Sequence, residues 1–233
     1  MTGVSTEELL FVPQVAPYRD GPAGVHGVLE QATTAVGQLA EIVGLRGRVV
    51  TDVRDLPTIT LARARALVLF TIGETPWSTD QRAAILERWR AGGLAVVGIH
   101  SASDACYGWD RYGEIIGARF DGHPWTQSMT VDVLDRSHPA TAHLDDTWAW
   151  HDEVYQFRDL RADAHVLLRV PAAQLDLTAP GARPPSFGYP LAWSVSDGRA
   201  RTFTTALGHF PGAWESPAYL RHVEGGLRWA LGT

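Results

Sequence analysis

The sequence predicts an α/β fold, a three-layer sandwich around a mainly parallel sheet, with antiparallel strands added in the C-terminal half. The first observation is the stretch 92–104, where a glycine pair precedes a short apolar run and then His100, Ser101 and Asp104. An unbroken apolar run between glycines is typical of a strand buried on both faces, as in a parallel sheet. The second observation is the alternation of such runs with helical patterns, which favours right-handed βαβ units.

The N-terminal half supplies most of the predicted parallel sheet. Apolar residues at helical spacing predict a helix over about 25–43, which Gly44 can end. Ser78 or Thr79 can cap a second helix that runs to about Arg90. The predicted strands of this half are 8–13, 48–51, 66–70 and the apolar run before His100.

The C-terminal half has a different pattern, in which short strands follow one another. After a helix at about 108–117, residues 129–133 alternate like a half-exposed strand. The segment 171–189 is rich in Pro, Ala and Gly and predicts a surface loop, and 217–231 predicts a final helix. Further strands are predicted at 153–157, 165–170, 191–195 and 201–206. The sequence contains no internal repeat and no linker, which favours a single domain over 1–233.

Composition excludes several classes of function. The formal charge of -6 leaves no basic surface for nucleic acid, and no apolar run approaches the ~18 residues of a membrane span. The first residues lack a signal-peptide pattern, and the single Cys106 permits neither an internal disulfide nor a CxxC motif. These features predict a cytoplasmic protein.

The chain contains no lysine, since its basic residues are all arginine. This excludes a Schiff base, a lysine that anchors PLP and a Walker-type phosphate loop. Gly21, Gly24 and Gly27 do not form G-x-G-x-x-G, so they are interpreted as turn residues rather than a phosphate site. No nucleotide, PLP or flavin cofactor is expected, and histidine becomes the main candidate for proton transfer near neutral pH.

Polar residues gather at predicted strand ends and turns of the second half. His100, Ser101 and Asp104 follow one strand, and His209 follows another. Ligands of open α/β sheets bind outside the carboxyl ends of the strands, so these positions predict a site. A single loop histidine is more often structural, but several beside Gly or Pro favour function. The other members of this polar set are His123, His151, Asp152, Glu153 and Tyr155.

Several ordered motifs over about residues 65–232 carry a family resemblance. They are Gly92-Gly93, Gly98-Ile-His-Ser-Ala-Ser-Asp104, Tyr107 to Tyr112, Phe120-Asp-Gly-His-Pro124, Asp135-Arg-Ser-His-Pro-Ala-Thr141, Asp152-Glu-Val-Tyr-Gln-Phe157, Pro190-Leu-Ala-Trp193, Gly198-Arg199, Thr205-Ala-Leu-Gly-His209 and Gly226-Leu-Arg-Trp-Ala-Leu-Gly232. In these motifs the sequence resembles the ThuA-like (trehalose-utilisation) proteins. The resemblance implies the flavodoxin-like fold of the class I glutamine amidotransferase superfamily. The family's Phe-Arg-His segment is matched only loosely, by Tyr18-Arg19-Asp20 and His26.

In glutamine amidotransferases the elbow after the strand presents a nucleophilic cysteine within Gly-x-Cys-x-Gly. The corresponding segment here is Gly98-Ile99-His100-Ser101-Ala102, with histidine in the cysteine position, and Cys106 lies beyond it. Glutamine hydrolysis is therefore not expected. A nucleophilic Ser101 is disfavoured because the Gly-x-Ser-x-Gly elbow is missing, so Ser101 is expected to bind a sugar hydroxyl or to cap a helix.

The resemblance implies carbohydrate chemistry, on sugars first oxidised to 3-keto forms. A ketone at C3 acidifies the C2 hydrogen, so a base can remove it while an acid protonates the leaving oxygen at C1. The expected catalytic residues are His100, His209, Glu153 and Asp104. His100, His123, His209 and Glu153 could instead hold a divalent metal, zinc or manganese, although no HxxxH or HxH spacing supports this.

The aromatic residues fit a carbohydrate ligand, because flat apolar sugar faces stack on aromatic rings. The alternative is core packing, which is favoured for Trp148 and Trp193. The expected substrate-binding residues are Ser101, Tyr107, Trp109, His123, Trp125 and Tyr155.

The sequence thus predicts a hydrolase or lyase that acts on a glycoside, an interpretation also compatible with a homo-oligomer. Two alternatives stay open. One is a sugar-binding module without catalysis, and the other is an epimerase or deglycosidase that acts on a glycosylated natural product.

Overall fold

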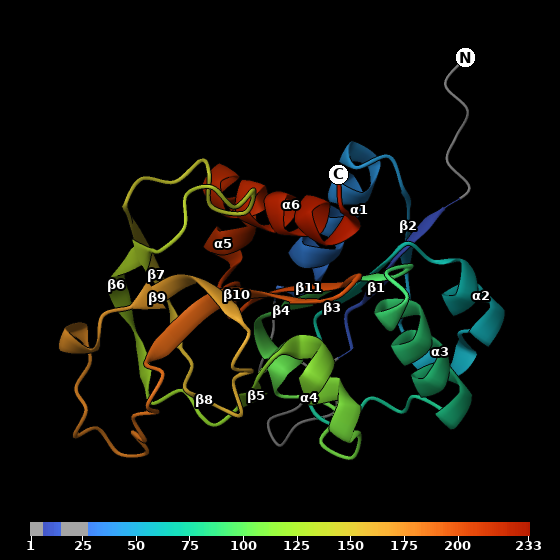
Figure 1. The fold of residues 1–233 in the computed structure, drawn as a ribbon. Helices are drawn as coiled ribbons and strands as arrows, with labels where there is room; N and C mark the ends of the chain where they lie inside the picture. The colour runs from blue at the N-terminus through green and yellow to red at the C-terminus, as the bar shows by residue number, and fades with distance from the viewer. Residues whose placement is uncertain (1–6, 15–27) are drawn as a thin grey trace.

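The computed structural model describes residues 7–14 and 28–233, and it has the layered α/β architecture that the sequence predicts (Figure 1). Its strands are β1 (Glu8–Val12), β2 (Arg46–Val49), β3 (Ala66–Leu69), β4 (Ala95–Ile99), β5 (Arg119–Phe120), β6 (Trp125–Val133), β7 (Thr147–Val154), β8 (Phe157–Arg158), β9 (His165–Val170), β10 (Tyr189–Asp197) and β11 (Ala200–Thr205). Its α-helices are α1 (Leu29–Ile42), α2 (Thr58–Arg63), α3 (Thr79–Arg90), α4 (Asp110–Ile116), α5 (Pro211–Glu215) and α6 (Pro217–Leu231).

The central sheet of the described residues is nine-stranded, in the order β2-β1-β3-β4-β11-β10-β9-β6-β7. Neighbours from β2 to β11 in this order are parallel, whereas those from β11 to β7 are antiparallel. The predicted parallel sheet with antiparallel strands added from the C-terminal half is therefore confirmed. A separate small sheet pairs β5 with β8.

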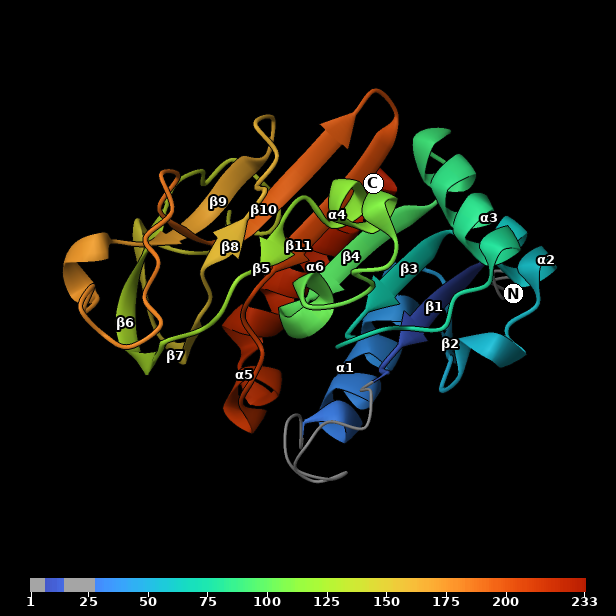
Figure 2. The ribbon, with the colours of Figure 1, turned by 90° about the horizontal axis from the view of Figure 1, so that it is seen from below.

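Helices cover both faces of the sheet, with α1 and α6 on one side and α2, α3 and α4 on the other (Figures 1 and 2). Successive side chains of a strand point to opposite faces of the sheet, so each strand contributes to the hydrophobic core on both sides. In β3, Val68 belongs to the core shared with α1 and α6, and Leu67 and Leu69 belong to the core shared with α3 and α4. A strand that faces apolar layers on both sides needs no polar alternation, which explains the unbroken apolar runs.

Several predicted boundaries differ from the structure. The strand predicted at 48–51 is β2, which begins earlier, at Arg46, and is exposed along its length as an edge strand. The strand predicted at 153–157 overlaps only the last two residues of β7, which ends at Val154, and Phe157 belongs to β8. β7 begins earlier than predicted, at Thr147, and the exposure of its first residues alternates. The short helices α2 and α5 were not predicted, because neither is long enough to show a helical period.

The final helix is confirmed at Pro217–Leu231, and the helix predicted at 108–117 is α4. The turn glycines Gly21, Gly24 and Gly27, the start of the first predicted helix, and the Tyr18-Arg19-Asp20 and His26 match lie outside the described residues. None of the helices within the described ranges is long and apolar enough to cross a membrane.

Candidate functional site

The site begins at the turn that follows β4. His100 takes a φ of +49° at this turn, a left-handed conformation that is uncommon for a residue with a side chain. A short 3-10 helix, His100–Ser103, follows directly. The chain therefore bends sharply at His100, and strain of this kind concentrates at functional positions.

The imidazole of His100 has one fixed tautomer. Its Nδ1 lies 2.9 Å from the carbonyl oxygen of Ala206, which can only accept a hydrogen bond, so Nδ1 carries the proton. In the neutral ring, Nε2 then presents its lone pair to the site. This atom lies 3.1 Å from Nδ1 of His209 and 2.9 Å from the hydroxyl of Tyr155.

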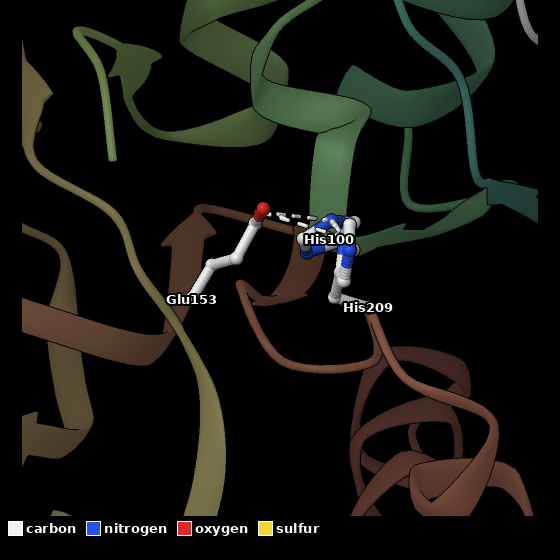
Figure 3. Close-up of side chains that lie close together, drawn as sticks. All are labelled: His100, Glu153 and His209. Carbon is white, nitrogen blue, oxygen red and sulfur yellow. Dashed lines mark hydrogen bonds and ion pairs between the residues drawn. The ribbon is translucent and has the colours of Figure 1, made fainter. Parts of the chain in front are cut away.

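Glu153 completes a cluster of three side chains with His100 and His209. Its Oε2 lies 3.5 Å from Nε2 of His100 and 3.4 Å from Nδ1 of His209. Figure 3 shows the three side chains pointing toward one another from three segments: the end of β4, the turn after β11 and the end of β7. Among the described residues this is the group of histidine and acidic side chains whose ligand atoms all lie within 4.8 Å of one another.

Burial sets the charge state of Glu153. Its side chain is only 11% exposed, and burial raises its pKa from 4.5 to about 7, helped by the negative charge of Asp152 and opposed by a hydrogen bond from Tyr155. A carboxyl group with this pKa can either take or give a proton near neutral pH. Burial also lowers the pKa of His209, and the nearby His123 adds to that effect.

A second row of polar residues lines the cluster. Nδ1 of His123 lies 3.5 Å from Oε1 of Glu153, and its ring packs against Tyr155. Burial lowers the pKa of His123, whereas the charge of Asp104 opposes that shift. Asp104 in turn accepts a hydrogen bond of 2.6 Å from the hydroxyl of Tyr107. This row links Tyr107, Asp104 and His123 to Glu153.

The structure thus brings His100, His209, Glu153, His123 and Tyr155 together, with Asp104 and Tyr107 beside them. Three further residues expected to bind substrate are also buried. Ser101 is fully buried, and Trp109 and Trp125 are packed into hydrophobic cores. Nε1 of Trp125 donates to the carbonyl of Asp176, and Trp109 lies beneath the guanidinium of Arg82. Their role in substrate binding stays a prediction, since position along the chain does not reveal which way a side chain points.

Asp152 belongs to the polar set found in the sequence, but it was given no catalytic, binding or metal role there. It is fully buried and accepts hydrogen bonds from backbone N–H groups of Gly208 and Glu153. Its place directly before Glu153 in a polar run is a signal of function, but the contact with Gly208 joins residues 56 positions apart. Local sequence cannot show such a contact.

The three-residue cluster has the dimensions of a metal site. Ligand atoms about 2.0 to 2.2 Å from a tetrahedral zinc ion lie roughly 3.3 to 3.6 Å from one another. Glu153 lies within this range of both histidines, at 3.4 Å from His209 and 3.5 Å from His100, and the two histidines are slightly closer to each other, at 3.1 Å. In addition, the bond from Nδ1 of His100 to a backbone carbonyl is the orienting contact that metal-binding histidines usually make. The donor set therefore fits a divalent ion.

Comparisons with known proteins agree with this fold. The family model ThuA, described as trehalose utilisation, matches residues 18–230. A ThuA-like protein from Bacteroides uniformis has 19% sequence identity and a TM-score of 0.75, covering 97% of this chain and 93% of its own. A ThuA-like protein from Parabacteroides merdae has 17% identity and a TM-score of 0.71, with 97% and 90% covered.

A more distant structure, that of a GMP synthase component from Thermoplasma acidophilum, has 13% identity and a TM-score of 0.51, with 96% of this chain and 94% of its own covered. The chain therefore also shares its fold with this protein, as expected for a fold of the glutamine amidotransferase type. No curated protein matches the chain.

Proposed function

We propose that this chain, which belongs to the ThuA (trehalose utilisation) family, is an enzyme that cleaves the glycosidic bond of a sugar oxidised to a ketone at C3. The observation that carries the proposal is the convergence of His100, His209 and Glu153 on one point beside a row of proton-transferring groups. An unoxidised glycoside has no acidic C2 hydrogen, so the chemistry depends on the ketone.

The reaction is an elimination that needs no oxidant or reductant. A base takes the C2 proton, the C2–H electron pair forms a double bond between C1 and C2, and the C1–O bond breaks. The leaving oxygen receives a proton. Water can then add to the unsaturated product, which makes the net result a hydrolysis.

His123 is suited to the proton transfers. Its lowered pKa leaves the imidazole neutral near pH 7, so it can accept the C2 proton, and the carboxylate of Asp104 stabilises the imidazolium that forms. The protonated ring can then supply the proton to the leaving oxygen. Its side chain is 45% exposed, which leaves it accessible to a substrate.

His100, His209 and Glu153 would hold a divalent metal, zinc or manganese, which supplies Lewis-acid stabilisation of the negative charge that develops on the sugar oxygens. Tyr155 contributes a hydroxyl beside the same point. Burial and the charge of Glu153 raise the pKa of Tyr155 well above its usual range, so it stays protonated and can donate a hydrogen bond to an oxyanion.

The proposal is tested by release of the leaving group from a 3-keto-glycoside and from its unoxidised parent, measured before and after chelation. We expect cleavage of the oxidised sugar alone, its loss on chelation, and its return with zinc or manganese. His100→Ala and Glu153→Gln should abolish it, whereas the exposed His165→Ala, on β9, should not.

Two results would overturn parts of this proposal. No cleavage with any added metal, together with sugar binding that survives His100→Ala, would favour a binding module without catalysis. Cleavage that resists chelation but is lost in Glu153→Gln would replace the metal by direct proton transfer from Glu153, whose pKa of about 7 suits that role.

A further inference from the structure

We infer that Asp152 is a positioning residue, whose buried carboxylate ties the turn after β11 to strand β7 and so fixes His209 against His100 and Glu153. The catalytic meaning of this role rests on the proposed function. The contacts of Asp152 are part of the fold, so their effect on the turn can be measured without a substrate.

Each carboxylate oxygen of Asp152 accepts two hydrogen bonds. Oδ2 accepts from the backbone N–H of Gly208 at 2.8 Å and from Nε1 of Trp150 at 3.1 Å. Oδ1 accepts from the backbone N–H of Glu153 at 2.9 Å and from that of His209 at 3.4 Å. Each of these partners is an N–H donor, so the ionised carboxylate, which only accepts hydrogen bonds, matches the site.

The turn that carries His209 depends on contacts from outside itself. Its carbonyl groups are held from one side, since Nε1 of Trp214 donates to Gly208 and the hydroxyl of Tyr219 donates to Leu207. Its N–H groups at Gly208 and His209 are held from the other side by Asp152. Asp152 therefore links the backbone of this turn to the strand that presents Glu153.

The conformation of Gly208 explains why the turn is stabilised from outside. Its φ is +118°, and a Cβ atom there would lie 2.4 Å from the hydroxyl oxygen of Tyr219. A side chain at this position cannot stabilise the turn, because it would be both strained and crowded. A buried acceptor on β7 supplies that stabilisation and places the next residue, His209, at the cluster.

Asp152→Asn tests the inference sharply. An amide has one oxygen and one NH₂ group, so in either orientation the NH₂ faces two N–H donors, and either Gly208 or His209 loses its acceptor. We expect amide hydrogen exchange at Gly208 or His209 to become roughly tenfold faster or more. Zinc affinity, measured by calorimetry, should fall by about 10- to 100-fold, as for other indirect partners of metal ligands.

Trp150→Phe is the matched control, since it removes one donor to Asp152 and leaves the turn bonded. It should leave both exchange at the turn and zinc affinity unchanged. Asp152→Ser, which removes the acceptors without opposing N–H groups, replaces Asp152→Asn if that variant does not fold. Unchanged exchange at Gly208 and His209 in a folded Asp152 variant would overturn the inference. If wild type binds no zinc, the metal proposal fails, and exchange still tests the role of Asp152.

Discussion

Nε2 of His100 lies 3.1 Å from Nδ1 of His209, although the two residues are 109 positions apart in the chain. The closeness follows from the sheet, because β4 and β11 are parallel neighbours in which Ile99 pairs with Thr205. Both strands end at the same edge, and each leads into a turn that carries one histidine. The site is thus a direct consequence of strand order.

The first prediction concerns metal binding. His209→Ala removes one of three candidate ligands, so zinc affinity should fall by more than the roughly 10- to 100-fold typical of losing an indirect partner. Calorimetry on metal-free protein measures this, with His165→Ala as control. A single bound equivalent in wild type and equal affinity in His209→Ala would remove His209 from the ligand set.

The second prediction concerns the pH dependence of stability in the presence of chelator. The pKa of Glu153 is raised from 4.5 to about 7 in the folded protein, so its contribution to stability is full below pH 4.5 and is lost as the pH rises through about 7. Glu153→Gln cannot ionise and keeps that contribution. Its melting temperature relative to wild type should therefore rise between these two pH values and then level off. A difference that does not vary with pH would contradict the raised pKa.

The third prediction concerns acid unfolding and His222. This histidine on α6 is fully buried, and burial lowers its pKa from 6.5 to about 3. A lowered pKa contributes stability that is present above pH 6.5 and is lost as the pH falls through about 3. Urea unfolding should show wild type losing stability over this range more steeply than His222→Gln. Parallel pH profiles for the two proteins would contradict this account.

The fourth prediction tests the packing of α6 on the sheet. A Cβ atom at Gly226 would lie 2.1 Å from the ring of Phe203, so Gly226→Ala should destabilise the protein by about 1–3 kcal/mol, as overpacking does. Gly37→Ala on α1 is the control, since nothing lies within 4 Å of its Cβ. That variant should gain up to about 1 kcal/mol from helix propensity. Equal effects in urea unfolding would argue against the close contact.

Much of the fold could be predicted because burial leaves a pattern within a short stretch of sequence. The apolar run before His100 and the helical spacing in 217–231 are such patterns, since each of these segments packs against an adjacent layer. Placing His100 and His209 in one site needed only the rule that ligands bind at the carboxyl ends of parallel strands. These parts of the site were therefore accessible from sequence.

The rest depends on contacts between distant segments. Glu153 reaches the cluster from β7, which lies at the far edge of the sheet order, and no periodicity reveals that path. Trp109 and Trp125 are of a residue type that often stacks on sugars. In the structure Trp109 packs against Arg82 and Trp125 against Tyr189, and both are buried. Asp152 accepts hydrogen bonds from backbone N–H groups of a turn. Almost every residue type has such a group, so the sequence does not reveal this contact.

The most direct test of the central claim is NMR analysis of a 3-keto-glycoside incubated with the protein in D₂O. Elimination followed by addition of water predicts deuterium at C2 of the released sugar, above the level of a protein-free control. His123→Ala and His100→Ala should prevent both cleavage and labelling. Rapid cleavage that leaves hydrogen at C2 would contradict removal of the C2 proton and with it the proposed chemistry.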